Sequence, residues 1–399
     1  MPPLHDDPVQ VEKILSISLL VIVISHTLIH VAGSIRTSIY PLIKEEFTLT
    51  NKQIGIIAAI PPLCQALFTL PAGVLSDKLT SRKIIAFSIG MAVTGALLAG
   101  ITLNVFMFIV ATSLLTLSST FFHPPANSYL SKDTTPQNRP KALGVFNSGG
   151  ILGFALGSFS ITILMGWWGY QWRDLYQFWI IPPLLILGGL YFVPTYPTGY
   201  SNSSEANLEE TEEEGTLLSS NMIFFLLASG IRRFGGSMTT AFLSIYLVER
   251  RTWTIGLVGL MFGVSRVIGL IAASLGGALA SHFGEKEWTI SSLFPAYVCF
   301  LAAFLVSGVV PFLALYLMYR FFGMLGMPAL SAITARLSPR EKRGRGYALS
   351  FLPGSIVGTI GPIVAGFIAD AFGIFPIFIL SGVIFCVGLV VLELGVNIK

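Results

Sequence analysis

Two histidines stand four residues apart in the first long apolar stretch of the chain. Residues 24–31 read ISHTLIHV, so His26 and His30 share one face of the helix that this stretch predicts. An imidazole gains or loses a proton near neutral pH and can also bind a metal ion. The pair therefore leaves three alternatives open: proton exchange, metal binding, or a plain hydrogen bond between helices.

Five arginines stand inside apolar stretches of the chain. A charged side chain costs roughly 2.5–3.5 kcal/mol at the centre of a membrane helix, so each arginine needs a partner or a water-filled cavity. No carboxylate is predicted at the same depth, so ion pairs within the protein cannot neutralise them all. A ligand with carboxylate, phosphate or phosphonate groups would accept bidentate hydrogen bonds from guanidinium groups. The five are Arg36, Arg232, Arg233, Arg266 and Arg320.

The composition is that of a membrane protein. Hydrophobic residues make up 53% of the 399 residues, charged residues make up 11%, and the mean hydropathy is +0.77, which excludes a water-soluble domain. A helix needs about 20 apolar residues to cross a bilayer. The sequence predicts an all-α polytopic fold, with twelve transmembrane helices in two pseudo-symmetric six-helix bundles. The predicted spans are 14–43, 52–76, 83–102, 104–131, 139–166, 174–194, 219–248, 252–281, 288–308, 309–336, 343–371 and 374–396.

Basic residues gather in alternate connections between these spans. Connections such as 103–104 and 308–309 carry none, and the positive-inside rule then places both termini in the cytoplasm. We expect a multi-pass protein of the cell membrane. The basic residues of the other connections include Lys78, Arg82, Lys83, Lys132, Arg139, Lys141, Arg336, Arg340, Lys342, Arg343 and Arg345.

The two halves of the chain resemble each other. SIYPLIKEEFTLTNKQIGIIAAI from Ser38 is echoed by SIYLVERRTWTIGLVGLMF from Ser244, and such matches are about 204 to 206 residues apart. Parallel repeats of this kind place the substrate at mid-membrane, between the halves. We expect an N-terminal six-helix bundle at 1–194, an acidic cytoplasmic linker at 195–218 and a C-terminal six-helix bundle at 219–399.

The arginines divide by their position in the spans. Arg266, Arg320 and Arg232 fall near the middles of three spans and are expected to face a cavity between the halves. Arg233 points about 100° away from its neighbour, and Arg36 is nearer a helix end. The alternative for these two is a structural role, reaching the membrane surface or donating to a backbone carbonyl. The expected substrate-binding residues are Arg36, Arg232, Arg266, Arg320, His26 and His30.

The loop GVLSDKLTSRK, between the second and third predicted spans, is similar to the signature loop of the major facilitator superfamily. Gly73, Asp77, Lys78, Arg82 and Lys83 match that pattern, and a threonine replaces its second glycine. The resemblance implies that the acid bonds neighbouring helix ends, or a basic residue such as Arg139, when the cytoplasmic side is shut. The expected gating residues are Gly73, Asp77, Arg82 and Arg139.

A narrower resemblance is to the fosmidomycin-resistance branch, drug exporters thought to exchange their substrate for protons. The chain shares Ser25, His26, Tyr40, Pro41, Glu46, Phe47, His123 and Pro124 with that branch. It departs at His30 and Pro125, where the branch has acidic residues. Both departures remove a negative charge, so histidine replaces carboxylate as the expected coupling group. The proton-coupling candidates are His26, His30 and His123.

Other kinds of chemistry lack the residues that they need. A metal site requires ligands beyond the first pair, and His123 and His282 are predicted toward the cytoplasmic side, so no multi-histidine metal centre is expected. Walker loops, dinucleotide fingerprints and nucleophile motifs are missing from the sequence, which argues against an ATP-driven pump or a membrane enzyme. We expect no metal, no cofactor and no nucleic-acid partner.

The sequence therefore predicts a secondary active transporter that works by alternating access. It moves a small, anionic organic solute through the bilayer, proton-coupled through histidines, and is expected to be a monomer. One alternative is a proton-coupled antiporter that exports mixed hydrophobic drugs. An alternative of another class is a transport-inactive membrane sensor or scaffold, which would bind a ligand without accelerating its flux.

Overall fold

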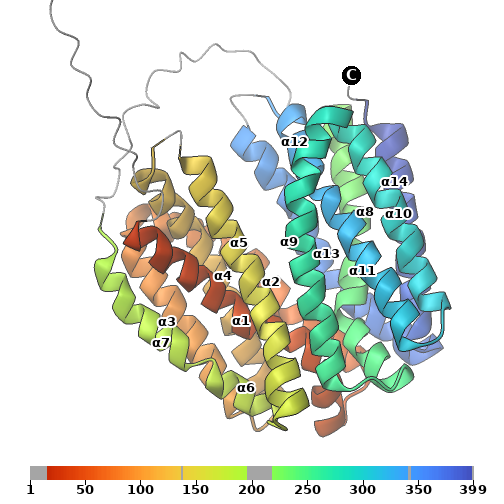
Figure 1. The fold of residues 1–399 in the computed structure, drawn as a ribbon, viewed down its shortest axis with the longest axis horizontal. Helices are drawn as coiled ribbons and strands as arrows, with labels where there is room; N and C mark the ends of the chain where they lie inside the picture. The colour runs from red at the N-terminus through yellow and green to blue at the C-terminus, as the bar shows by residue number, and fades with distance from the viewer. Residues whose placement is uncertain (1–15, 136–137, 196–217, 340–342, 398–399) are drawn as a thin grey trace, which may run out of the picture.

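In the computed structural model, the described residues are 16–135, 138–195, 218–339 and 343–397. Within these ranges the regular elements are helices throughout. Figure 1 shows them as two bundles side by side, the first running from red to yellow-green and the second from green to blue. The predicted fold class is confirmed, whereas the predicted linker falls almost wholly outside the described residues.

The first bundle holds the helices from α1 to η2. Its α5 continues directly into a π-helical turn, and α6 and α7 form one crossing that is interrupted before Pro182, because a proline cannot donate to the preceding turn. The elements are α1 (Ile17–Glu46), α2 (Asn51–Lys78), α3 (Ser81–Gly100), α4 (Val105–Asp133), α5 (Arg139–Ser160), η1 (Ile161–Trp167), α6 (Trp172–Phe178), α7 (Ile181–Gly189) and η2 (Leu190–Phe192).

The second bundle also holds six crossings, with its irregular turns on other helices of the repeat. Its α8 continues into a π-helical turn, and α11 and α12 form one crossing that is interrupted at Gly326. The elements are α8 (Ser220–Ile245), η4 (Tyr246–Arg250), α9 (Ile255–Phe283), α10 (Glu285–Leu305), α11 (Val309–Leu325), α12 (Met327–Leu337), α13 (Arg343–Phe372) and α14 (Phe375–Gly395).

The structure gives twelve crossings when the interrupted helices are joined. Ten of them are long and apolar enough to span a membrane, counted over the described residues. The other two are α8, which carries Arg232 and Arg233, and α13, whose apolar part Ile356–Phe372 is shorter. Both exceptions border the cavity between the bundles, where polar groups can be hydrated.

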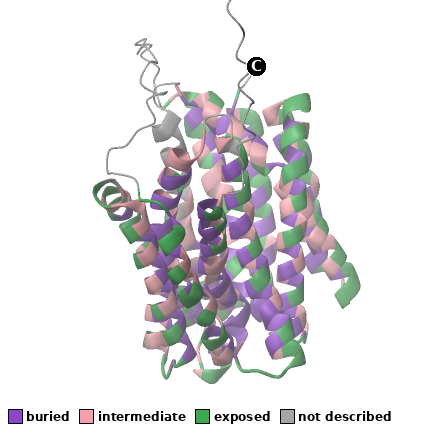
Figure 2. Cartoon of the chain, turned by 60° about the vertical axis from the view of Figure 1, so that its left-hand side comes forward, coloured by how far each residue is buried: buried purple, intermediate pink, exposed green. Residues whose placement is uncertain are grey.

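The outward faces of the bundles are apolar. Figure 2 shows exposed residues along the outer sides of the helices and buried ones between them. Leu70 is 80% exposed, Leu185 is 73% exposed and Leu394 is 76% exposed. Such a surface is unfavourable in water and favourable against lipid chains, which fits a multi-pass membrane protein.

Polar side chains fix where several helices begin. In α2 the Thr50 hydroxyl accepts a hydrogen bond from the Gln53 N–H, and in α9 the Thr254 hydroxyl accepts one from the Leu257 N–H. Such caps stabilise a helix by about 1 kcal/mol each. The two threonines are 204 residues apart and begin equivalent helices, so the internal repeat of the sequence is visible in the structure.

The two bundles meet at one end, which we name the sealed end. It is the end at which α1 finishes and α2 begins. The Lys44 ammonium lies 2.7 Å from the Glu249 carboxylate, and the Asp370 carboxylate accepts hydrogen bonds from the N–H groups of Asn51 at 3.0 Å and Lys52 at 2.9 Å. Asp370 of the second bundle therefore caps α2 of the first.

Small residues let the helices approach closely at the sealed end. Gly256, Gly259 and Gly263 contact α5 and η1, and they lie on one face in the first half of α9. A Cβ atom placed on Gly166 of η1 would come within 3.0 Å of the Gly256 Cα. The contact is therefore dense at one end of the helices.

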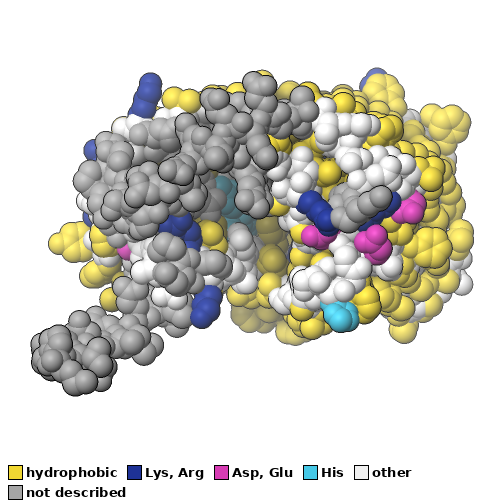
Figure 3. All heavy atoms as spheres, turned by 90° about the horizontal axis from the view of Figure 1, so that it is seen from above, with side chains coloured by type: hydrophobic (Ala, Val, Ile, Leu, Met, Phe, Trp, Pro, Cys, Tyr) yellow, Lys and Arg dark blue, Asp and Glu magenta, His cyan; other side chains and the backbone are white. Residues whose placement is uncertain are grey.

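We name the opposite end, at which α1 begins, the open end. Figure 3 looks onto this end and shows a recess between the two halves, with histidine side chains visible deep inside it. The recess leads toward the groups that the sequence singles out. The fold therefore holds a cavity that is closed at one end of the bundles.

Removing the Asp370 cap should loosen the sealed end. Leu103 and Val310 are exposed residues at this end, one in each bundle, and Leu103→Cys and Val310→Cys allow a spin label at each. We expect Asp370→Ala to lengthen and broaden the distribution of distances between the two labels. Double electron–electron resonance measures this distance in a background where the three native cysteines are replaced.

The matched control is Asp174→Ala. Asp174 caps α6 through the Gln171 N–H at 2.8 Å with the same chemistry, but within one bundle. Equal distance distributions in Asp370→Ala and in the unsubstituted protein would show that the cap does not hold the bundles together.

Candidate functional site

A cavity of about 340 Å³ lies between the bundles, just below the sealed end. Its lining comes from α1, α5, α8, α9, α10, α11 and α13, so both halves contribute. Three arginines line it together with hydroxyl groups and aromatic rings. The arginines are Arg233, Arg266 and Arg320.

The three guanidinium groups are held by packing. Arg266 lies over the ring of Phe154 with its Cζ at 5.0 Å from the ring centre, and Arg320 lies over Tyr319 at 6.0 Å. Arg233 lies against Gly354, where a Cβ atom would come within 2.7 Å of its Nη1. Among the described residues none of the three arginines has a carboxylate within 4.0 Å. The cavity therefore carries uncompensated positive charge.

The structure brings together only part of the predicted binding set. Arg266 and Arg320 line the cavity as predicted, but Arg233 takes the place expected for Arg232. The Arg232 Nε donates to the Tyr297 hydroxyl at 2.7 Å, inside the second bundle. Its side chain borders a smaller, adjoining cavity of about 170 Å³, which Arg233 and Arg320 also line.

Arg36 lies apart from this group. Its Nη1 donates to the Thr116 hydroxyl at 3.2 Å, which ties α1 to α4 inside the first bundle. It does not line the main cavity, which Ser34 and Thr37 of the same helix reach. The prediction that Arg36 joins the other arginines in one site was therefore wrong in its geometry, because position 36 faces the neighbouring helix.

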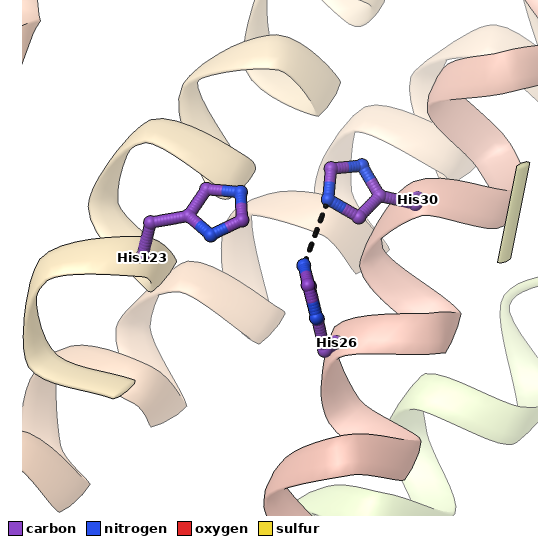
Figure 4. A group of neighbouring side chains, drawn as sticks. All are labelled: His26, His30 and His123. Atoms are coloured by element: carbon purple, nitrogen blue, oxygen red, sulfur yellow. Dashed lines mark hydrogen bonds between the residues drawn. The ribbon is translucent and has the colours of Figure 1, made fainter. Parts of the chain in front are cut away.

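The histidines form a cluster of three, drawn in Figure 4. His26 and His30 come from α1 and His123 comes from α4, and one ring nitrogen of each lies within 4.8 Å of those of the other two. The Nε2 atoms of His26 and His30 are 3.1 Å apart. The His26 Nδ1 donates to the Phe146 carbonyl at 2.7 Å, which fixes the orientation of that ring.

His123 lies beside the pair on α1, so the prediction that its position keeps it from joining a multi-histidine group was wrong. His26 is nine residues from the start of α1 and His123 is ten residues from the end of α4. These two helix ends are joined, since the Ser18 hydroxyl donates to the Asp133 carboxylate at 2.9 Å. At 1.5 Å per residue both histidines therefore lie about 15 Å below the same end.

Glycines of α5 make room for the histidine-bearing face of α1. A Cβ atom on Gly150 would lie 2.6 Å from the His26 Cε1, and one on Gly153 would lie 3.0 Å from the His30 Cβ. The rings of Phe146 and Phe154, also on α5, stack on His26 at 4.0 Å and on His30 at 4.4 Å. Helix α5 therefore supplies both the space and the walls of the cluster.

The predicted gating residues lie around the open end. The Arg139 Nη2 donates to the Ser131 carbonyl at 3.0 Å, and Arg82 lies over the Tyr191 ring at 5.8 Å. Gly73 lies within α2. The side chain of Asp77 is outside what the structure describes, so its expected bond with Arg139 stays a prediction.

Two membrane-spanning six-helix bundles, around a cavity that reaches one end only, are the arrangement of a membrane transporter. The model of the Major Facilitator Superfamily matches residues 22–318 and 225–396. The chain belongs to this family. It is therefore a transporter of small molecules across a membrane and not an enzyme.

Relatives and solved structures agree with this assignment. The chain is 23% identical to an MFS-type efflux pump of Mycolicibacterium smegmatis over 355 residues, covering 82% of this chain and 78% of the relative. It is 26% identical to the fosmidomycin resistance protein of Escherichia coli over 146 residues, or 37% and 36% of the two chains. The fold matches a bacterial homologue of the human lysosomal transporter Spinster, in an inward-facing and occupied conformation, with a TM-score of 0.81 and 16% identity over 94% and 96% of the chains.

Filling the α1–α5 contact should destabilise the first bundle. We expect Gly153→Ala to lower the melting temperature in detergent by several degrees, because the added methyl group meets the backbone of Thr27 and the His30 side chain, and overpacking costs about 1–3 kcal/mol. Gly144→Ala on the same helix is the control, since a Cβ atom there meets nothing within 4 Å. Similar melting temperatures for the two variants would contradict the close packing.

Proposed function

We propose that the chain moves a small organic anion by alternating access and that the arginine-lined cavity is its binding site. One observation carries the proposal: Arg233, Arg266 and Arg320 come from three helices of the second bundle and line one cavity without a carboxylate nearby in the described residues. Unpaired positive charge inside a membrane-spanning bundle is costly unless water or a ligand compensates it. An anionic substrate removes that cost when it binds.

The size and lining of the cavity suit a small molecule. A volume of about 340 Å³ is at the lower end of the range for ligand pockets. Guanidinium groups can bind a carboxylate or phosphonate in bidentate fashion, while Phe300, Tyr316 and Tyr319 offer apolar surface to the rest of the ligand. Ser34 and Ser158 bring hydroxyl groups from the first bundle, so a bound ligand would contact both halves.

The contacts between the bundles suggest which state the structure represents. Basic residues at the open end favour a cytoplasmic position for this end by the positive-inside rule. The proposal is therefore an inward-facing cavity in a protein of the cell membrane, with both termini cytoplasmic. We propose that the bundles at 1–194 and 219–399 rock about the bound ligand as a monomer. In the outward-facing state the contacts of Asp370 and Glu249 with the first bundle would separate.

The histidine cluster lies next to this cavity and supports proton coupling. The ring of Phe154 is stacked on that of His30, with 4.4 Å between the ring centres, and the Arg266 Cζ lies 5.0 Å from the centre of the same Phe154 ring. Phe154 therefore lies between the cluster and the cavity. A proton on His30, His26 or His123 would add positive charge close to the anion. Proton and anion would then favour each other, which is the linkage that a proton-coupled transporter requires.

Export of hydrophobic drugs is the second candidate. An apolar groove of about 540 Å³ lies between α8 and α13, and its residues Leu227 and Ile356 are 51% and 52% exposed. An apolar molecule could enter from the lipid along this groove. The name of the efflux pump of Mycolicibacterium smegmatis supports the direction of transport in this candidate, which is export.

Ligand-induced thermal stabilisation separates the two candidates. We expect phenylphosphonate, an anionic probe, to raise the melting temperature of the purified protein, and tetraphenylphosphonium, a hydrophobic cation, to leave it unchanged. Arg266→Ala and Arg320→Ala should each weaken the anion response about tenfold or more, as expected for the loss of a charge-assisted hydrogen bond.

Arg250→Ala is the matched control, because Arg250 is exposed at the sealed end, away from the cavity. Stabilisation by the cation alone, or an anion response that survives both cavity substitutions, would contradict the anion site and favour drug export.

Replacing His30 should change the pH dependence of transport. We expect anion flux in liposomes to increase as the pH falls, because protonated histidines attract the anion, and His30→Gln should flatten this dependence while flux at alkaline pH persists. His282→Gln is the control, since His282 lies at the far end of α9. An unchanged pH profile in His30→Gln would exclude this histidine as a coupling group.

A further inference from the structure

We propose that His26, His30 and His123 form a binding site for a divalent first-row transition-metal ion, of the class of Zn²⁺, Co²⁺, Ni²⁺ and Cu²⁺. The proposal rests on the geometry of the three side chains and not on the proposed function. Nothing in the family match or in the relatives assigns such a site to this chain. The spacing in the sequence indicates only the pair His26 and His30 on α1, and the fold brings His123 of α4 to them as a third ligand.

The three ring nitrogens are placed for a common ion. Each histidine offers one nitrogen within 4.8 Å of the other two, and the His26 and His30 Nε2 atoms are 3.1 Å apart. Zinc binds imidazole nitrogen at about 2.0–2.1 Å in tetrahedral geometry, which separates the ligand atoms by roughly 3.4 Å. In the proposed site the His30 and His123 rings rotate to bring separations of up to 4.8 Å to this value.

A backbone hydrogen bond determines which ring nitrogen of His26 carries the proton. The Phe146 carbonyl accepts the hydrogen bond from the His26 Nδ1, so the proton resides there and the Nε2 lone pair faces the cluster. Metal-binding histidines are commonly oriented by a hydrogen bond of this kind. In the metal-free state His30 can donate its Nε2 proton to His26, and a shift of that proton to Nδ1 frees the second lone pair.

Aromatic rings hold the ligands in place. His26 is 3% exposed, and its ring is stacked on that of Phe146 at 4.0 Å and lies near the roughly parallel ring of Phe122 at 5.6 Å. His30 and His123 are only partly buried, so an ion can reach them and a fourth position stays open for water or an anion. The ligands are thus rigid on one side and accessible on the other.

The ligand chemistry selects the class of ion. Three imidazoles with no carboxylate or thiolate in the cluster, as far as the described residues extend, suit borderline transition metals and not Ca²⁺ or Mg²⁺, which prefer oxygen ligands. The charged group that faces the cluster from another helix is Arg266, across the Phe154 ring. Its positive charge disfavours a bare cation and favours an anion as the fourth ligand.

Cobalt titration of the purified full-length protein tests the site, with an affinity tag that contains no histidine. We expect one equivalent of Co²⁺ to bind and to give the intense visible absorption of tetrahedral coordination. His30→Asn and His123→Asn should each weaken binding at least about tenfold, and His282→Asn should not. Lowering the pH from about 7.5 to 5.5 should weaken binding in the unsubstituted protein, because protons compete for the same lone pairs.

A second measurement needs no variant, in case a substitution impairs folding. Zn²⁺ should protect His30 and His123, but not His282, from modification by diethyl pyrocarbonate, as read by mass spectrometry. Equal modification with and without Zn²⁺, or cobalt affinity that survives both cluster substitutions, would overturn the metal site. Because both measurements read binding alone, they can succeed or fail independently of anion transport.

Discussion

Positive charge held inside a membrane-spanning bundle is the constraint on which the rest of this structure depends. Arg233, Arg266 and Arg320 have no carboxylate within 4.0 Å in the part of the chain that the structure describes. Guanidinium groups in this position require water or a ligand. The cavity between the bundles supplies the space, and the apolar outer faces of the same helices keep the bundles in lipid. The buried positive charge therefore requires the cavity, and the closed end keeps that cavity accessible from one side only.

The two bundles contribute differently to that arrangement. The second bundle provides the arginines, and the first provides hydroxyl groups and, behind Phe154, the histidine cluster. The pseudo-symmetric halves have thus diverged in chemistry while keeping equivalent helix starts at Thr50 and Thr254. Closure at one end comes from contacts between the halves, such as the Asp370 cap on α2, and these can break without unfolding either bundle.

The fold could be predicted from the sequence because apolar length, basic connections and the repeat all follow from the bilayer itself. The side-chain directions could not. Arg232 and Arg233 point about 100° apart, so a small error in helix rotation exchanges them. The meeting of His123 with the pair on α1 was missed because the depths of the three histidines were not compared from the helix ends, which the Ser18–Asp133 contact aligns. The closed end also escapes prediction, since alternative states of a transporter differ by a small free energy that sequence patterns do not encode.

Accessibility of a cysteine in the cavity tests most directly whether this is a one-sided anion site. Thr240 is exposed in the cavity wall, and Thr240→Cys in a background without Cys64, Cys299 and Cys386 gives a single target for a membrane-impermeant thiol reagent. We predict rapid labelling from the side of the open end, slow labelling from the opposite side, and protection by phenylphosphonate. Equal labelling from both sides, or labelling that the anion does not slow, would contradict the cavity as the transport site.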